Sequence, residues 1–144
     1  MAKVTRFGGR TTLSWFGDFV GDVAEQIALN VMKEKMRQVK TDALLRLYLN
    51  HGVATGTMKA RVHVAPGCYN WSADHLEPQE NAPALHDDYT PRKMRGKWAL
   101  EIGSGQKYAL SYHQNYDPFL RIPFEQHMRG FKSEVGRQWR ATFQ

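Results

Sequence analysis

Apolar side chains recur every three or four residues along the first third of the chain, which is the spacing of one helical face. Asp18 is a suitable N-cap for this helix, and His51-Gly52 offers a left-handed stop after about residue 50. The pattern predicts one long helical region and leaves open a break near Thr41-Asp42. Its apolar stripe consists of Phe16, Val20, Val23, Ile27, Val31, Met36, Val39, Ala43 and Leu47.

Two later segments alternate between apolar and polar positions, as half-buried strands do. In TMKARVHV, residues 57–64, the predicted buried face holds Met58, Ala60, Val62 and Val64, and the wet face holds Lys59, Arg61 and His63. In KWALEIGS, residues 97–104, the two faces hold Trp98, Leu100 and Ile102 against Ala99 and Glu101. A glycine turn is predicted at residues 103–105.

The two ends of the chain differ in character. Near the C-terminus, the stripe of a further helix consists of Phe124, Met128, Phe131, Val135 and Trp139. Pro123 suits the first turn of that helix, where a missing N–H costs nothing. Residues 1–16, which contain Gly8-Gly9 and Thr11-Thr12, are predicted to form a flexible basic arm.

The fold class follows from the order of these elements. Residues 67–91 contain Pro78, Pro83, Pro91 and many acids, so we interpret them mainly as an acidic loop excursion. Two strands make a thin sheet, so we expect one or two more within residues 67–97, or else completion of the sheet edges by another copy. The chain is predicted to be α+β: residues 17–144 form one domain, a small antiparallel sheet packed by a long N-terminal helix and a C-terminal helix.

Composition is that of a globular protein, with 144 residues of which 42% are hydrophobic and 24% charged. The single cysteine, Cys68, allows no internal disulfide, which fits a reducing compartment, and we expect it to be a small packed residue. We see neither a secretory signal nor the ~20 apolar residues of a membrane span, so no membrane partner is expected.

The formal net charge of +6 is compatible with a polyanionic partner or with a soluble basic protein that has none. The distribution of charge is more informative than its total. Residues 72–90 hold five acids and no Lys or Arg, whereas residues 91–97 hold four bases and no acid. This arrangement favours charge complementarity, either within the chain or between copies.

Catalytic motifs are weak. A nuclease would need a base and an acid on either side of a ribose hydroxyl, and His63, Glu101 and His113 could supply them. We expect His63 to be an ordinary histidine on the polar face of a strand. The run at residues 86–88 with His75 offers metal ligands but lacks the paired spacing of zinc sites, so we interpret it as a solvated acidic loop. No catalytic residue, metal site or cofactor is assigned.

The segment GQKYALSYHQNYDPFLRIPFEQ, residues 105–126, gathers aromatic rings beside a histidine. If exposed, these rings could stack on nucleic-acid bases at ~1–3 kcal/mol each. However, Phe119, Leu120, Ile122 and Phe124 form a run too apolar to be left together in water. We therefore predict that Phe119 and Leu120 are buried and anchor the last helix.

Two motifs occur in order along the chain. The first, a Thr-Gly followed by an apolar residue and a basic strand, consists of Thr55, Gly56 and Met58. The second, a strand glycine, a Tyr-Ala, a His-Gln and Pro-Phe-Leu-Arg-x-Pro, contains Gly103, Tyr108, Ala109, His113, Pro118, Phe119, Leu120 and Pro123. Their order resembles the neck and tail-completion proteins of tailed bacteriophages, a group that includes the lambda-type tail completion protein Z and the Mu-type virion morphogenesis proteins. The chain departs from the group's pattern at Met58, Asn115 and Phe124, where Leu, Gly and Ala are usual.

The resemblance implies a structural protein of the virion and not an enzyme. Members form rings, often hexameric, at the head–tail junction or the top of the tail. The implied partners are other copies, neighbouring neck, adaptor or tail-tube proteins, and DNA that passes with loose electrostatic contact. The protein would be made in the cytoplasm of the bacterial host. Alternatives are a tail terminator ring or, in another class, a basic nucleic-acid-binding protein or small nuclease.

Contacts around a ring are heterologous, with one surface meeting a different surface on the next copy. The charge pattern supplies candidate faces for such a contact. We predict interface residues in the arm, in the acidic segment and in the basic segment: Arg6, Arg10, Asp74, Glu77, Asp87, Asp88, Arg92, Lys93 and Arg95.

Overall fold

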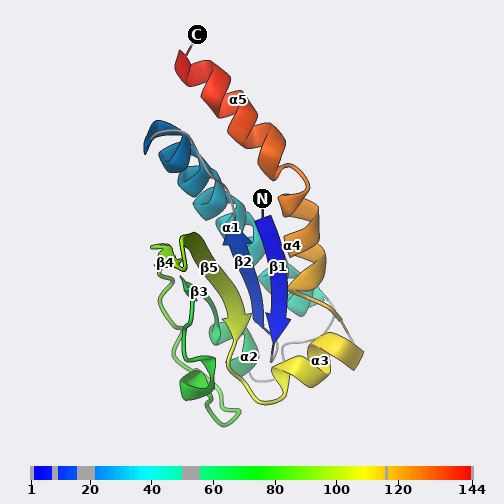
Figure 1. Cartoon of the computed structure of the whole chain (residues 1–144). Helices are drawn as coiled ribbons and strands as arrows, with labels where there is room; N and C mark the ends of the chain where they lie inside the picture. Colours follow the sequence, from blue (N-terminus) through cyan, green and yellow to red (C-terminus); the bar gives the residue numbers. More distant parts are fainter. Residues whose placement is uncertain (1, 8–9, 16–21, 50–55, 116, 144) are drawn as a thin grey trace.

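The computed structural model describes residues 2–7, 10–15, 22–49, 56–115 and 117–143 (Figure 1). Along the chain the elements are β1 (Ala2–Phe7), β2 (Arg10–Trp15), α1 (Asp22–Leu49), α2 (Thr57–Ala60), β3 (Val62–Pro66), the 3-10 helix η1 (Trp71–Asp74), β4 (Arg92–Met94), β5 (Lys97–Ser104), α3 (Ala109–Asn115), α4 (Arg121–Met128) and α5 (Phe131–Phe143).

The strand β5 is the centre of an antiparallel sheet. On one side it pairs with β2, and β1 extends the sheet beyond β2. On the other side β3 pairs with residues 100–104 of β5, and β4 pairs with residues 97–99. The α+β class is confirmed, and β4 is the additional strand expected within residues 67–97.

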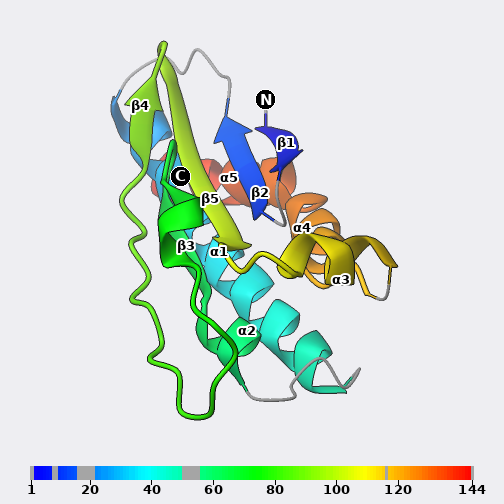
Figure 2. The same ribbon diagram turned by 90° about the horizontal axis from the view of Figure 1, so that it is seen from below.

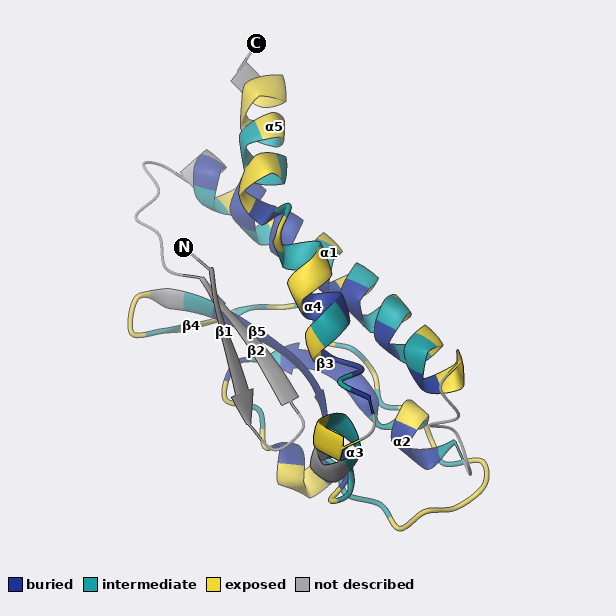
Figure 3. Cartoon of the chain, turned by 90° about the vertical axis from the view of Figure 1, so that its right-hand side faces the viewer, coloured by how far each residue is buried: buried dark blue, intermediate teal, exposed yellow. Residues whose placement is uncertain are grey.

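One face of the sheet packs on the helix α1, as Figures 1 and 3 show. Val64 and Ile102 are paired across β3 and β5, and both are fully buried against that helix. The helical stripe is confirmed for the members Ile27, Val31, Met36, Val39, Ala43 and Leu47, all of which are buried. The helix runs unbroken through Thr41-Asp42. The predicted cap at Asp18 and the stop at His51-Gly52 lie outside the described residues.

Polar contacts join α1 to distant parts of the chain. Lys40 Nζ lies 2.5 Å from Asp87 Oδ2, and Arg46 Nη2 lies 2.6 Å from Asp117 Oδ1. The Asp117 side chain is only 8% exposed, so the guanidinium supplies a partner that a buried carboxyl needs. The loop before β4 and the turn before α4 are both positioned on this helix as a result.

The C-terminal helix differs from its prediction, because a turn at Arg129-Gly130 divides it into α4 and α5. Glycine is a poor helix former and favours such an interruption. Phe124 and Phe131 are buried, whereas Trp139 is 40% exposed, so the outer part of α5 extends past the core (Figure 3). No described helix combines the length and apolarity that a membrane crossing needs.

The N-terminal segment also differs from its prediction. In place of a flexible arm, residues 2–7 and 10–15 pair as strands β1 and β2, with Val4 opposite Leu13. The signal was present in the sequence, because a Gly-Gly pair between two segments rich in β-branched residues is typical of a hairpin. The arm's backbone therefore belongs to the sheet over these residues.

A third correction concerns residues 57–60, which form the short helix α2 and not the start of a strand. Gly56 precedes this helix with a φ of 86°, a left-handed conformation that suits glycine. Met58 is buried as predicted. The strand itself begins at Val62.

Gly105 lies directly beneath η1. A Cβ built on Gly105 would be 1.9 Å from the main-chain oxygen of Trp71, so an added methyl group would force the backbone to move. We expect Gly105→Ala to lower the free energy of unfolding by about 1–3 kcal/mol or more, measured by chemical denaturation.

Gly136→Ala is the matched control for this prediction. Its added Cβ would meet only the end of the Arg140 side chain, at 3.4 Å, and alanine favours a helix by roughly 1 kcal/mol. We expect Gly136→Ala to be neutral or stabilising. Equal denaturation midpoints for Gly105→Ala and the parent would show that η1 does not pack on this residue.

Candidate functional site

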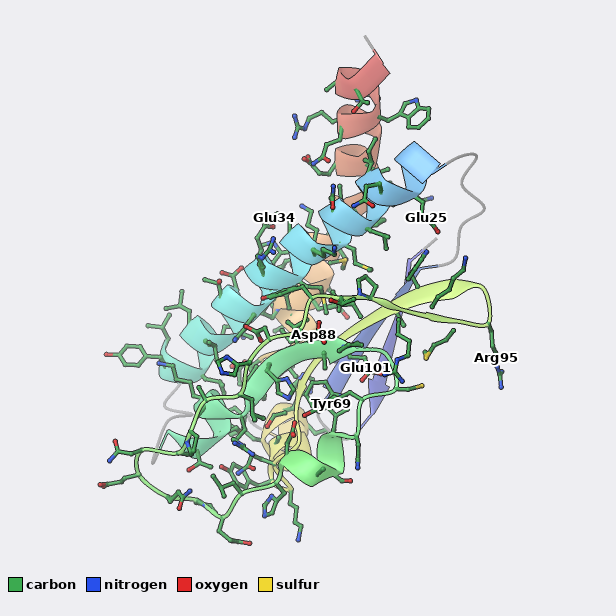
Figure 4. The ribbon with its side chains drawn as sticks, turned by 90° about the vertical axis from the view of Figure 1, so that its left-hand side faces the viewer. Glu25, Glu34, Tyr69, Asp88, Arg95 and Glu101 are labelled. Atoms are coloured by element: carbon green, nitrogen blue, oxygen red, sulfur yellow. The ribbon has the colours of Figure 1, made fainter. Side chains whose placement is uncertain are left out.

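The face of the sheet that points away from α1 is covered by the segment that follows β3, residues 67–76. Five side chains gather there, and we call them the polar cluster: His63, Tyr69, Trp71, Asp74 and Glu101. Figure 4 shows Tyr69 and Glu101 close together, on the side of β3 away from α1. His63 is 2% exposed, which corrects the prediction of a wet face on β3, and Glu101 of β5 is 4% exposed.

Asp74 binds His63, Tyr69 and Arg61. Its Oδ2 lies 2.7 Å from His63 Nε2, and its Oδ1 accepts the Tyr69 hydroxyl at 2.6 Å. Its main-chain oxygen accepts two N–H groups of the Arg61 guanidinium, at 3.0 and 2.8 Å. This one residue therefore binds η1 to β3.

Glu101 holds the beginning of the same segment. The Trp71 indole donates to Oε2 at 2.5 Å, and the Cys68 N–H donates to Oε1 at 3.2 Å. The ring centroids of Trp71 and His63 lie 4.7 Å apart, a distance typical of favourable ring contacts. A buried carboxyl is costly unless donors of this kind surround it. Glu101 is thus an internal anchor of the covering segment.

The His63–Asp74 pair has the composition of a general acid–base pair. Catalysis would require a ring nitrogen that reaches a reacting group. Here Nε2 faces Asp74, Nδ1 faces the Val64 carbonyl oxygen at 3.3 Å, and the Tyr69 and Trp71 rings flank the imidazole. This geometry fits the attachment of residues 67–76 to the sheet better than proton transfer to a bound molecule.

The structure brings together only two of the three residues considered for a nuclease. His63 and Glu101 both contact Trp71. His113 lies on α3, where its Nε2 accepts the Arg121 main-chain N–H at 3.2 Å and its ring packs edge-on against Phe119. The three groups do not converge on one site.

The possible metal ligands are also used elsewhere. His75 Nδ1 accepts the Lys107 N–H at 3.2 Å, and Asp87 binds Lys40. Over the described ranges, no three His, Cys, Asp or Glu side chains are placed to hold a metal ion.

Cys68 is exposed, which corrects the prediction of a packed residue. It follows the buried Gly67 in a left-handed turn with a φ of 62°, and its Sγ lies 3.0 Å from Met94 Sδ.

The candidate interface residues whose side chains are described differ in burial. Asp74 is buried, and Asp87 binds Lys40 and the Val64 N–H within the chain while its side chain stays 21% exposed. The exposed candidates are Glu77, Asp88, Arg92, Lys93 and Arg95. Arg6 and Arg10 contribute backbone to β1 and β2, and their side chains lie outside the described residues.

The motif residues build the packing of the fold. Gly56 caps α2 and Gly103 pairs with His63 in the sheet, while Thr55 is outside the described residues. The buried members are Met58, Gly103, Ala109, Phe119, Leu120 and Pro123, and the half-buried members are Gly56, Tyr108, His113 and Pro118. The prediction that Phe119 and Leu120 anchor the last helix is confirmed by their complete burial.

Sequence reasoning did not find the polar cluster. Its members come from three separate segments. The alternation of residues in β3 and β5 is the same whether the second face meets water or is covered by another segment. One signal was available: Tyr69 and Trp71 are two aromatic residues in an otherwise polar stretch, which suggests a packed segment.

The Tyr69 hydroxyl provides a test of the polar cluster. Burial, together with the hydrogen bond to Asp74 and its charge, raises the pKa of Tyr69 from 10.0 to about 12, against an opposing effect of Arg61. The folded state therefore holds this proton more tightly, and the associated stability is present below pH 10 and lost as the pH rises toward 12. We expect the phenolate absorbance that Tyr69→Phe removes to develop near pH 12. If the absorbance step that Tyr69→Phe removes is instead centred near pH 10, Tyr69 is exposed to solvent.

The fold and the polar cluster define a class: an α+β protein whose sheet uses buried ionisable side chains to hold its own covering segment. No family model, curated protein or solved structure matches the chain. The proposal of a function therefore depends on the geometry of the molecule and on its motifs.

Proposed function

We propose that this protein is a structural subunit of a tailed-bacteriophage virion. It assembles into a ring at the head–tail junction as a neck or tail-completion protein, joins head to tail and leaves a passage for DNA. A tail terminator ring that caps the tail tube is the close variant. The protein acts by assembly and needs no cofactor.

The role of the motif residues carries the proposal. Phe119 and Leu120 are completely buried, and Gly56 adopts the left-handed conformation that its position before α2 requires. The residues that carry the resemblance are therefore those that build the architecture. Such a distribution supports a protein whose shape is its function.

The ionisable side chains of the sheet support the same reading. His63, Asp74 and Glu101 are at most 5% exposed. His63 is bonded to Asp74, and Glu101 accepts the Trp71 indole, so these side chains hold residues 67–76 on the sheet. A hydrolytic site needs an acid or base that a substrate can reach. A nuclease is therefore the weaker alternative.

The test has two parts. Light scattering and negative-stain imaging of the purified protein should reveal a closed ring in equilibrium with smaller species. In a phage that encodes this chain, a nonsense mutation in its gene should leave full heads and separate tails. A protein that stays monomeric at all concentrations, with normal virions formed in its absence, would contradict the proposal.

The out-of-class alternatives predict different results. A nuclease would cleave nucleic acid, and His63→Ala or His113→Ala would abolish the cleavage. A basic nucleic-acid-binding protein that does not assemble would remain a monomer with an affinity that falls steeply as salt is added.

A further inference from the structure

The β4–β5 hairpin protrudes from the sheet. Among the described residues, β3 pairs with β5 as far as Leu100 and β2 as far as Trp98, so residues 94–97 lie beyond the last described pair of either strand, whereas Arg92 and Lys93 lie opposite Ala99 and Trp98. Figure 2 shows the tip of this hairpin at the end of the molecule opposite the acidic loop and α2. Arg95 lies at the tip and points away from the body in Figure 4.

The hairpin is held rigidly. Arg95 and Gly96 form its two-residue turn with φ values of 52° and 79°, both in the left-handed region that matches the twist of a tight hairpin. The Trp98 indole donates to Glu25 of α1 at 2.5 Å, and the Gly67 N–H donates to the Ala99 oxygen at 3.1 Å. The base of the hairpin is therefore fastened to α1 on one face and to the end of β3 along its edge.

The hairpin carries positive charge on both faces and at its tip. Lys93 faces the α1 side, where its Nζ lies 5.5 Å from the centre of the Trp98 ring. Arg92 alternates with it and faces the other side, and all three bases are exposed. Among the described residues, no carboxyl lies within ion-pair distance of Arg92, Lys93 or Arg95.

A second copy of the chain is a poorer partner for this charge than a polyanion. In the acidic segment Glu77, Glu80 and Asp88 are exposed, whereas Asp74 and Asp87 are bound within the chain. Gln79 is bonded to Thr57 at 2.8 Å, which places that loop beside α2 and its exposed Lys59. A surface of mixed charge is a weaker match for three exposed basic side chains than a uniformly charged polyanion is.

We infer that the β4–β5 hairpin binds the phosphate backbone of double-stranded DNA without reading its sequence. Basic side chains on both faces of the hairpin can contact phosphates of either strand, and DNA of any sequence that passes through a ring requires no readout of base edges. The inference rests on the proposed function for its setting: the hairpins would face the lumen and contact the DNA that passes.

The test uses the purified full chain and a short DNA duplex of arbitrary sequence. The hairpin variant is R92Q/K93Q/R95Q, and the matched control is K59Q/K107Q/K132Q, which also replaces three exposed bases. Both variants lower the formal net charge from +6 to +3, so a difference between them reports position and not total charge. Binding is measured by fluorescence anisotropy over a range of salt concentrations, after denaturation curves show that both variants fold.

The salt dependence gives the expected magnitude. Each phosphate contact contributes about 0.9 to the slope of log affinity against log salt, so the hairpin variant should lower that slope by about 2.7. The control should leave the slope close to that of the parent. Equal losses in the two variants, or no loss in either, would overturn the inference.

Assembly is measured on the same samples, so that the two proposals fail separately. A hairpin variant that keeps its DNA affinity but loses oligomer mass would place the hairpin against another copy and overturn the inference. Hairpin-dependent DNA binding by a protein that stays monomeric would support the inference and count against the ring. A ring whose DNA affinity is the same in the parent and the hairpin variant would support the proposed function and overturn the inference.

Discussion

Phe119→Ala is expected to lower the free energy of unfolding by about 3–5 kcal/mol, because it opens a cavity where α3 meets α4. Phe119 is 0% exposed, and its ring packs edge-on against Tyr112 and His113 at centroid distances of 5.9 and 5.5 Å. Domains of this size are stable by only about 5–15 kcal/mol, so the variant should lose much of its folded population. Urea denaturation followed by tryptophan fluorescence measures the effect.

Leu45→Ala is the control for this variant. Leu45 lies on α1 and is 52% exposed, so its truncation should change stability by no more than about 0.5 kcal/mol. Similar midpoints for the two variants would show that the Pro-Phe-Leu motif is not part of the core. The assembly assay adds a second readout, since a subunit without this packing should not form rings.

Asp74→Ala is expected to have the next largest effect, a loss of roughly 3–5 kcal/mol, because it removes the acceptor for the buried His63 ring and the half-buried Tyr69 hydroxyl. His63 Nε2 and the Tyr69 hydroxyl, at 2.7 and 2.6 Å, would both lose their partner inside the polar cluster. Residues 67–76 should then open more readily from the sheet. Chemical denaturation and hydrogen exchange at this segment measure the loss.

Two further variants separate the role of Asp74 from a general effect on η1. Ser72→Ala changes an exposed residue of the same helix and should cost no more than about 0.5 kcal/mol. Tyr69→Phe removes one hydrogen bond, worth about 1 kcal/mol, and its effect should shrink when combined with Asp74→Ala, because the two share one contact. An Asp74→Ala variant as stable as Ser72→Ala would show that the polar cluster does not hold the covering segment.

Local patterns predicted the elements whose formation depends on near neighbours in the chain. The apolar spacing of α1 identified its buried face from Ile27 to Leu47, and the alternation of KWALEIGS identified β5. The same patterns failed where a second segment changed the surroundings. His63 was predicted to be wet because its strand alternates, and it is buried because residues 67–76 cover it.

The candidate interface residues show the same difference between local patterns and contacts with distant segments. The sequence placed the acidic and basic segments next to each other and could not say which charges were already paired. Asp87 meets Lys40 from a helix far away in the sequence, whereas Arg92, Lys93 and Arg95 form no ion pair with a carboxyl of the described residues.

The sequence by itself determined the long helix, the central strand and the burial of Phe119 and Leu120. Each depends on periodicity or on a run of apolar residues that water disfavours. Only the tertiary structure decided that Glu101 is an internal anchor, that Cys68 is exposed and that the basic hairpin protrudes. These outcomes depend on which segment returns over which face, and contacts between distant segments leave no period in the sequence.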